Sequence, residues 1–484
     1  MFLCPSTQCE SGAVFALIPR GVHMRPISST ALALAGALLH GAALAAQPLQ
    51  VTTTADEFDG ICDSHCSLRD AIEQANVTPG LTHIRLPAGD YRISRPSPFG
   101  AYGLATEEDQ NQTDDYDIRG EMIIQGAGSE STRIIGFQFD DLPSFATTAD
   151  LVGQPLARLF EVHPDAHLGL VDLQLMDGFS LLEGGALANH GETLLKNVDI
   201  YRNRVRTPEP LGSQTGKPLW GVGGGVVNYG SLKAYNTRFV SNSVEVQGLS
   251  RLSGSALFNY GELVLRDALF YSNASPLEIW KDVGGPVLEN HGSADIARMR
   301  MARNSLGVDG NIALRNHGIL KLSNSEFAAL QGLQNGSPED HDAEANLIHV
   351  TLYAGVRNDA GMEVRNSVFS QGCGNGAQAR FTASGLLAPA GSECPGDVFP
   401  IQARSTDAGK VAPAAPSISV APAQRTIQIE LASLLPPGYP NAAAIDAAVG
   451  DCSEHDMTGA FRPQDGNGDG VALCDLGAME KPSP

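Results

Sequence analysis

The sequence has little positive charge, because its 32 Lys and Arg residues are outnumbered by 54 Asp and Glu residues, which gives a formal net charge of −22. This imbalance argues against nucleic acid or an anionic membrane as a partner. Charged residues make up only 18% of the chain, whereas glycine occurs 53 times. Such a composition suits tight, stacked turns better than helices.

Several signatures of enzyme chemistry are missing. The sequence contains no phosphate-binding loop, no dinucleotide fingerprint, no Gly-x-Ser-x-Gly elbow and no cluster with zinc-ligand spacing. A chain of 484 residues exceeds what one compact core usually holds, so we expect several domains or a solenoid.

A long apolar run occurs only near the start. Arg25 follows Met24, the apolar stretch runs from Ala31 to Leu44, and small residues precede Ala46. We interpret residues 1–46 as a leader with a secretory signal peptide that starts at Met24. No later run reaches the length of a membrane span, so we expect an exported mature chain without a transmembrane segment.

One short pattern returns between Gly184 and Ser275. Glycines and small apolar residues precede an Asn-x-Gly turn, and a run of alternating residues then ends on a second asparagine. The turn asparagines are 39, 31 and 31 residues apart, and the closing asparagines repeat these spacings (turn: Asn189, Asn228, Asn259, Asn290; closing: Asn203, Asn242, Asn273, Asn304). Landmarks that keep a common spacing while insertions vary elsewhere are typical of a solenoid.

The repeat unit is made of strands. Asn and Gly both tolerate the positive φ of a tight turn, and the alternation after each turn predicts strands rather than a helix. Coils of short strands that stack at roughly 4.8 Å form a parallel β-helix. We therefore predict an all-β parallel β-helix with an asparagine ladder (Asn189, Asn228, Asn259, Asn290, Asn316). A β-sandwich with Asn-Gly hairpins is the alternative.

The start of the exported chain predicts a cap. Ser67 and Asp70 form a capping box, and the apolar residues after them share one face of a short helix. Such a helix would cover the open end of the first coil, as solenoids require. We divide the exported chain into a cap at residues 47–93, coils with inserted loops at 94–400, and a C-terminal coil or linker with a disulfide-bonded tail at 401–484. We expect one of the inserted loops at residues 333–345 and a last alternating strand at residues 427–431.

The six cysteines outside the leader come in close pairs: Cys62 with Cys66, Cys373 with Cys394, and Cys452 with Cys474. An even number in an exported chain favours disulfides over metal thiolates. We predict that each cysteine binds its neighbour in the sequence, although other connectivities are open.

These motifs support a family resemblance. The word from Cys66 to Ala71 resembles the CSLREA motif of exported bacterial right-handed parallel β-helix proteins. The repeats are similar to those of the polymorphic outer membrane protein family, and the tail from Asp475 to Glu480 resembles the D-I-G-A-F-E ending of CSLREA proteins. The resemblance extends from about residue 51 to 480. It implies a right-handed β-helix at or outside the bacterial cell surface, and no particular reaction.

The tail also contains a candidate calcium loop. Oxygen ligands at its positions 1, 3 and 5, a glycine at 6 and a backbone carbonyl at 7 follow the calcium-binding pattern, with an aspartate at position 11 in place of the usual glutamate (Asp465, Asn467, Asp469, Val471, Asp475). We expect either a structural Ca²⁺ ion or a plain Asp/Gly turn held by Cys452 and Cys474.

The residue after each turn asparagine is usually a ring (His190, Tyr229, Tyr260, His291, His317). If the asparagine points inward, these rings form an outward column on successive coils. Aromatic faces along such a column suit sugar rings, whereas the alternative is that the rings only cover the turn.

No residue is predicted to be catalytic. Several aspartates could supply carboxylates for a polysaccharide lyase or hydrolase, but none lies in a matching motif (Asp114, Asp115, Asp140, Asp141, Asp172, Asp177, Asp199). We therefore expect a monomeric, adhesin-like surface module that binds glycans or another cell surface. A β-helix polysaccharide lyase or glycoside hydrolase is the alternative, and a passive spacer is a third possibility.

Overall fold

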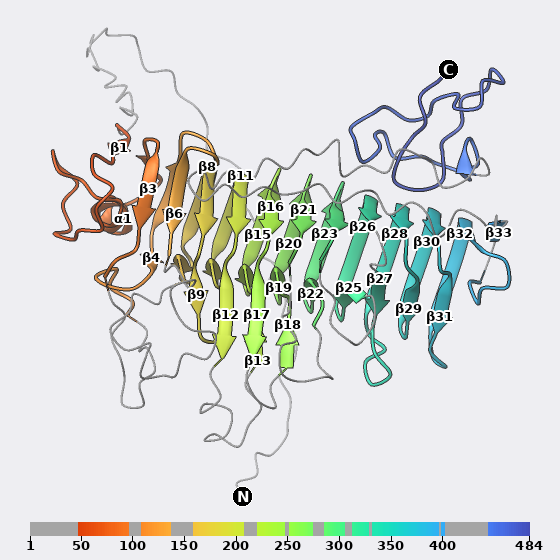
Figure 1. Ribbon diagram of the computed structural model, residues 1–484, viewed down its shortest axis with the longest axis horizontal. Helices are drawn as coiled ribbons and strands as arrows, with labels where there is room; N and C mark the ends of the chain where they lie inside the picture. Colours follow the sequence, from red (N-terminus) through yellow and green to blue (C-terminus); the bar gives the residue numbers. More distant parts are fainter. Residues whose placement is uncertain are drawn as a thin grey trace, which may run out of the picture. The chain divides into compact units, whose positions relative to one another are not determined.

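The computed structural model describes residues 47–95, 108–136, 158–207, 220–246, 251–273, 285–304, 312–328, 332–395, 398–401 and 444–484. The predicted leader and the proposed strand at residues 427–431 lie outside these residues. The described part is a parallel β-helix, in which short strands return to the same sheets coil after coil (Figure 1). The predicted fold class is confirmed.

The largest sheet has 18 strands, and its paired strands run parallel. Its strands are β1 (Leu49–Gln50), β2 (Thr82–Arg85), β3 (Gly89–Arg92), β5 (Glu121–Gln125), β6 (Thr132–Ile135), β8 (His167–Met176), β11 (Glu192–Tyr201), β15 (Ser231–Tyr235), β16 (Arg238–Val240), β20 (Glu262–Arg266), β21 (Leu269–Tyr271), β23 (Ser293–Ala297), β24 (Arg300–Ala302), β26 (Ile319–Phe327), β28 (Glu344–Leu352), β30 (Gly361–Phe369), β32 (Arg380–Pro389) and β33 (Val398–Ile401).

A second sheet has ten short parallel strands and contains the turn asparagines. Its strands are β4 (Tyr116–Ile118), β7 (Phe160–Val162), β10 (Leu187–Asn189), β14 (Val226–Asn228), β19 (Leu257–Asn259), β22 (Leu288–Asn290), β25 (Ile312–Asn316), β27 (Gly332–Asn335), β29 (Val356–Asn358) and β31 (Cys373–Asn375). Because β27 belongs to this sheet, the predicted loop at 333–345 is wrong at both ends: it begins after Asn335, and β28 starts at Glu344.

Two small sheets come from insertions between the coils. One contains β9 (Phe179–Ser180), β12 (Arg204–Thr207) and β17 (Ser243–Val246), and the other contains β13 (Trp220–Val222) and β18 (Arg251–Ser253). The side chain of Val222 packs with Val227 and Phe258 of the ten-stranded sheet. The segment with β13 therefore covers part of the outer face of the ten-stranded sheet.

The interior of the coils is an apolar core in which equivalent residues lie above one another. In the large sheet, Leu195 pairs with Ala234, which pairs with Leu265, and all three are fully buried. The rings of Phe239 and Phe270 stack with their centroids 4.5 Å apart. Full burial of one such aliphatic side chain contributes about 1.5–3 kcal/mol, so the repeat is also the unit of stability.

In the eight successive coils from β8 to β30, the chain turns a corner at a residue with positive φ. The corner lies within the long strand, or between its two halves, and is usually an Asn or Asp (Asp172, Asn197, Asn236, Asp267, Arg298, Asn324, His349, Asn366). These two residue types tolerate the left-handed region better than other residues with a side chain. This second polar column was not recognised in the sequence.

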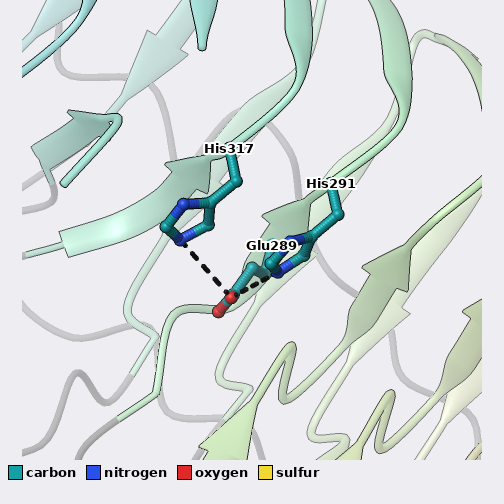
Figure 2. Close-up of side chains that lie close together, drawn as sticks. All are labelled: Glu289, His291 and His317. Carbon is teal, nitrogen blue, oxygen red and sulfur yellow. Dashed lines mark hydrogen bonds and ion pairs between the residues drawn. The ribbon is translucent and has the colours of Figure 1, made fainter. Parts of the chain in front are cut away.

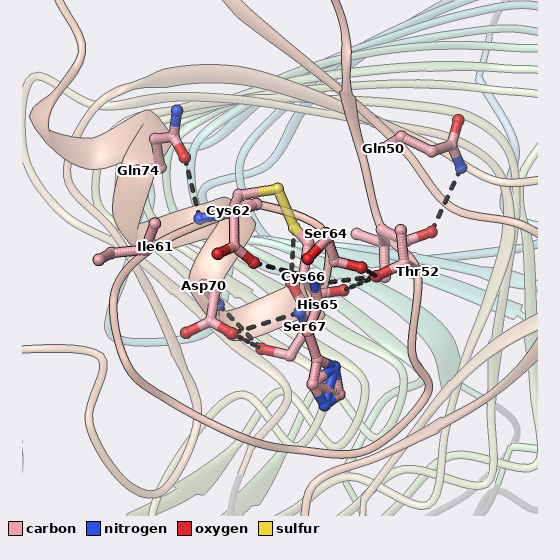
Figure 3. Close-up of a disulfide and its surroundings, with 12 residues drawn as sticks. Gln50, Thr52, Ile61, Cys62, Ser64, His65, Cys66, Ser67, Asp70 and Gln74 are labelled. Carbon is pink, nitrogen blue, oxygen red and sulfur yellow. Dashed lines mark hydrogen bonds between the residues drawn. A yellow bond between two sulfur atoms is a disulfide. The ribbon is translucent and has the colours of Figure 1, made fainter.

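The helix α1 (Leu68–Val77) lies at the start of the coils and contacts β2, β4 and β5. Ser67 Oγ accepts a hydrogen bond from the Asp70 backbone N–H, and the Asp70 carboxylate accepts one from the Ser67 N–H, so the predicted capping box forms. Leu68, Ala71 and Ile72 are buried. The disulfide between Cys62 and Cys66 closes the loop just before the helix (Figure 3).

The tail at 444–484 packs on the outside of the large sheet. Leu476 and Ala444 form an apolar cluster with Val368 and Leu387. The buried guanidinium of Arg462 binds the carboxylate of Glu480 at 2.8 Å and also donates to backbone carbonyls of the tail. The ending from Asp475 to Glu480 is thus a folded part of this tail.

Candidate functional site

The candidate site is the outer face of the ten-stranded sheet, and an asparagine ladder fixes its geometry. Asn189, Asn228, Asn259, Asn290 and Asn316 are fully buried. Each Nδ2 donates to the Oδ1 of the next asparagine at 2.6–2.7 Å. The ladder continues through Asn335 and Asn358, beyond the predicted members. Because successive residues of a strand face opposite ways, the residue after each asparagine faces outward.

The five rings expected at these positions form a continuous stack that we call the ring column (His190, Tyr229, Tyr260, His291, His317). Neighbouring centroids are 4.9, 5.3, 5.1 and 4.6 Å apart, with interplanar angles of 8°, 9°, 34° and 17°. Tyr229 and Tyr260 are 37% and 42% exposed. Three of the four contacts are stacked and the Tyr260–His291 contact is tilted, so the column presents mainly ring edges. The faces that we expected to suit sugar rings are therefore mostly covered by neighbouring rings.

Carboxylates line the first half of the column. The hydroxyl of Tyr229 donates a hydrogen bond to Glu183, which comes from the turn before β10. Burial raises the pKa of Tyr229, and this hydrogen bond raises it further. The carboxylate of Glu161 lies 3.9 Å from His190 Nε2 and also binds Arg158 at 2.9 Å. This half therefore offers hydroxyl groups and carboxylates side by side.

The second half of the column contains the most closely grouped ionisable side chains. Oε1 of Glu289 lies 2.8 Å from His291 Nε2 and 3.8 Å from His317 Nε2, and the three side chains converge (Figure 2). Burial alone would raise the pKa of Glu289. The hydrogen bond to His291, the charge of Arg315 and the hydroxyl of Ser253 outweigh it and lower that pKa. A buried carboxylate is thus held ionised beside two imidazoles.

Sequence reasoning included both histidines of this group and missed Glu289. The missing signal was the spacing Glu289-Asn290-His291. Two residues that flank an inward-facing asparagine on a strand share the outer face, so Glu289 had to lie beside the ring column. The contribution of Asp340, whose carboxylate binds His317 at 3.0 Å, could not be seen because it comes from the loop after β27.

A smaller group lies near the cap. Asp117 Oδ1 is 3.2 Å from His163 Nε2, and Asp117 Oδ2 accepts the backbone N–H of Asn111. The hydrogen bond to Asp117 raises the pKa of His163, while burial raises the pKa of Asp117. Asp109 completes a set that could hold a metal ion, but Asp109 is exposed.

The aspartates considered for catalysis have structural contacts. Asp177 binds Arg202 at 2.6 Å, Asp199 binds Arg238, and Asp172 accepts a hydrogen bond from Asn197. Each contact joins neighbouring coils. Elsewhere, Asp115 binds Arg158, and the carbonyl of Asp114 accepts a hydrogen bond from Arg69. Asp140 and Asp141 lie outside the described residues.

The candidate calcium loop folds around Asp465. Its carboxylate accepts the backbone N–H groups of Gly468, Asp469 and Gly470 at 2.7–3.1 Å, and the side-chain oxygens of Asn467 and Asp469 accept further N–H groups. The exposed Val471 follows Gly470.

Asp475, the predicted fifth ligand, is buried and accepts N–H groups from Asp446 and Lys481. Burial raises its pKa. Asp446 in turn accepts the N–H of Asn467, so the loop is tied to a residue that sequence reasoning did not include. Binding of Ca²⁺ stays a prediction.

All three disulfides form between the predicted neighbours: Cys62–Cys66, Cys373–Cys394 and Cys452–Cys474. Disulfides are typical of oxidising, extracytoplasmic compartments. Among the described residues, no helix has the length and apolar character needed to cross a membrane. None of the family models, curated proteins or solved structures compared with the chain matches it.

Proposed function

We propose that the protein is an exported, adhesin-like module that binds uncharged glycans through the edges of the ring column. The observation that carries this proposal is a column of five outward-facing rings on successive coils, whose edges carry hydroxyl groups and ring nitrogens (His190, Tyr229, Tyr260, His291, His317). The strip repeats at roughly the 4.8 Å spacing of strands, so it offers similar contacts along an extended chain.

The chemistry of the strip favours sugars without charge. Glu161 and Glu183 lie beside the first rings, and carboxylates accept strong hydrogen bonds from hydroxyl groups. The net charge of −22 disfavours anionic polysaccharides, because like charges repel at long range. The resemblance of the Cys66–Ala71 word to exported CSLREA proteins, and of the repeats to polymorphic outer membrane proteins, supports a location at the bacterial surface.

A glycan array with the purified chain tests the proposal. Tyr229→Phe combined with Tyr260→Phe removes both hydroxyl groups and keeps the stack, and we expect it to weaken binding about tenfold or more. Tyr235→Phe is the matched control, since Tyr235 is similarly exposed, at 38%, but lies on the large sheet. The proposal would be refuted if the double substitution left glycan affinity unchanged, or if the wild-type chain bound no glycan. Release of reducing ends from a bound polysaccharide would favour the lyase or hydrolase alternative.

A further inference from the structure

The histidines at the second end of the ring column belong to adjacent coils. Asn290 of β22 pairs with Asn316 of β25, so His291 and His317, which follow them, lie on neighbouring rungs. Glu289 precedes Asn290 and faces the same side. Three potential metal ligands therefore converge from two stacked strands, and all three ligand atoms lie within 4.8 Å of one another.

The distances fit a small ion. A tetrahedral ion with bonds of about 2.0–2.1 Å has ligands about 3.3 Å apart. The separations from Glu289 Oε1 to the two Nε2 atoms are 2.8 and 3.8 Å, which bracket this value. The stacked rings of His291 and His317 lie 4.6 Å apart and 17° from parallel, so both Nε2 atoms lie on the same side, next to Oε1 of Glu289 (Figure 2).

Outer contacts orient these ligands. Asp340 lies 3.0 Å from Nδ1 of His317, and Ser253 donates a hydrogen bond to Oε2 of Glu289. A carboxylate on the far nitrogen of a histidine fixes its tautomer, as in metal sites. The tautomer of His317 with its proton on Nδ1, toward Asp340, would present the lone pair of Nε2 to an ion beside Oε1 of Glu289.

We propose that Glu289, His291 and His317 bind one divalent first-row transition metal ion, with Zn²⁺ as the reference case. Two imidazoles and one carboxylate are a ligand set that suits zinc or iron. Three protein ligands leave at least one position for water or another ligand. The partly exposed rings, at 26% for His291 and 17% for His317, place this position toward the outer face of the sheet. The inference does not depend on glycan binding.

Metal titration of the EDTA-treated full chain tests the site. We expect Zn²⁺ to bind with micromolar or tighter affinity, and Co²⁺ to give visible ligand-field absorption that Zn²⁺ displaces. His317→Phe keeps the ring stack and removes one ligand, so it should weaken this binding at least tenfold, as should Glu289→Gln. Asp340→Asn should weaken it about 10- to 100-fold through the outer contact.

His190→Phe is the matched control, because His190 occupies the same column away from Glu289, and it should leave metal binding unchanged. Circular dichroism of each variant establishes that the β-helix still forms. The proposal is overturned if the wild-type chain binds no Zn²⁺ at 100-fold molar excess. It is also overturned if folded His317→Phe and Glu289→Gln chains bind Zn²⁺ and Co²⁺ as the wild type does.

Discussion

The asparagine ladder offers a direct test of what stabilises the coils, and Asn259→Ala is the informative change. Asn259 is fully buried. It accepts a hydrogen bond from Asn228 at 2.6 Å and donates one to Asn290 at 2.7 Å. After the substitution, Oδ1 of Asn290 loses its ladder donor, and the amide of Asn228 keeps only its two backbone acceptors.

The size of the effect follows from these losses. A buried polar group left without a partner costs about 1–3 kcal/mol, and two groups are affected to different degrees. We expect Asn259→Ala to lower the free energy of unfolding by about 3 kcal/mol. The matched control is Asn375→Ala. Asn375 aligns with the ladder at its last strand but is exposed, and its amide donates to the carbonyl of Glu393. Its loss should cost about 0.5 kcal/mol.

Urea unfolding followed by circular dichroism measures both changes. Because each coil of a solenoid contacts only its neighbours, hydrogen exchange should also show that Asn259→Ala loosens β14, β19 and β22 before the distant strands. The reasoning is refuted if the free energies of unfolding of the two variants agree within 1 kcal/mol, or if hydrogen exchange rises equally in all strands. Buried amide stacking would then not be what holds adjacent coils together.

Three further predictions concern a buried histidine at a corner of the coils, the cap and the tail. Burial, together with the charge of Arg462, lowers the pKa of His349 to about 3 in the folded chain. In the unfolded chain this imidazole binds a proton from about pH 6.5 downward. The free energy of unfolding is therefore highest above that pH and falls by about 2 kcal/mol at pH 5. The melting temperature of His349→Asn should fall less between pH 7.5 and 5 than that of the wild type. An equal fall in both chains would contradict the lowered pKa of His349. Arg69 and Asp56 form a buried ion pair at 2.7 Å, so Arg69→Met should lower the free energy of unfolding, measured in urea, by about 3–5 kcal/mol. Adding Asp56→Asn should restore part of this loss. A loss below 1 kcal/mol for Arg69→Met alone would contradict a stabilising ion pair. Millimolar Ca²⁺ should raise the melting temperature, because binding at 100 times Kd adds about 2.7 kcal/mol to the free energy of unfolding. Asp465→Asn should abolish this rise. An unchanged melting temperature of the wild type in Ca²⁺ would exclude a calcium-stabilised tail.

Several parts of the molecule followed from local sequence. The capping box of Ser67 and Asp70 depends on residues three apart, and short disulfide loops bring their cysteines together with little conformational freedom to lose. The glycine-flanked asparagines repeat with strand periodicity, so their inward direction and the outward direction of the next residue were predictable. That is why the ring column was expected at the residues where it lies.

Other features depended on contacts between coils. The coils from Asn290 onward are shorter, with asparagine spacings of 26, 19 and 23 residues, and this irregularity hid β27 inside a predicted loop. The aspartates considered for catalysis bind partners such as Arg202 and Arg238 on adjacent coils. Spacing along the chain does not show such pairs until the register is known.

The sequence by itself determined the repeating unit, its strand content and the direction of each side chain, because these are set by neighbours one or two residues away. Tertiary structure alone decided that the rings cover one another's faces, that Glu289 meets His317 from the next coil, and that Asp475 accepts backbone N–H groups in the tail. Each of these depends on the register between strands and on the path of inserted loops. Those are fixed only when the coils stack and bury their common core.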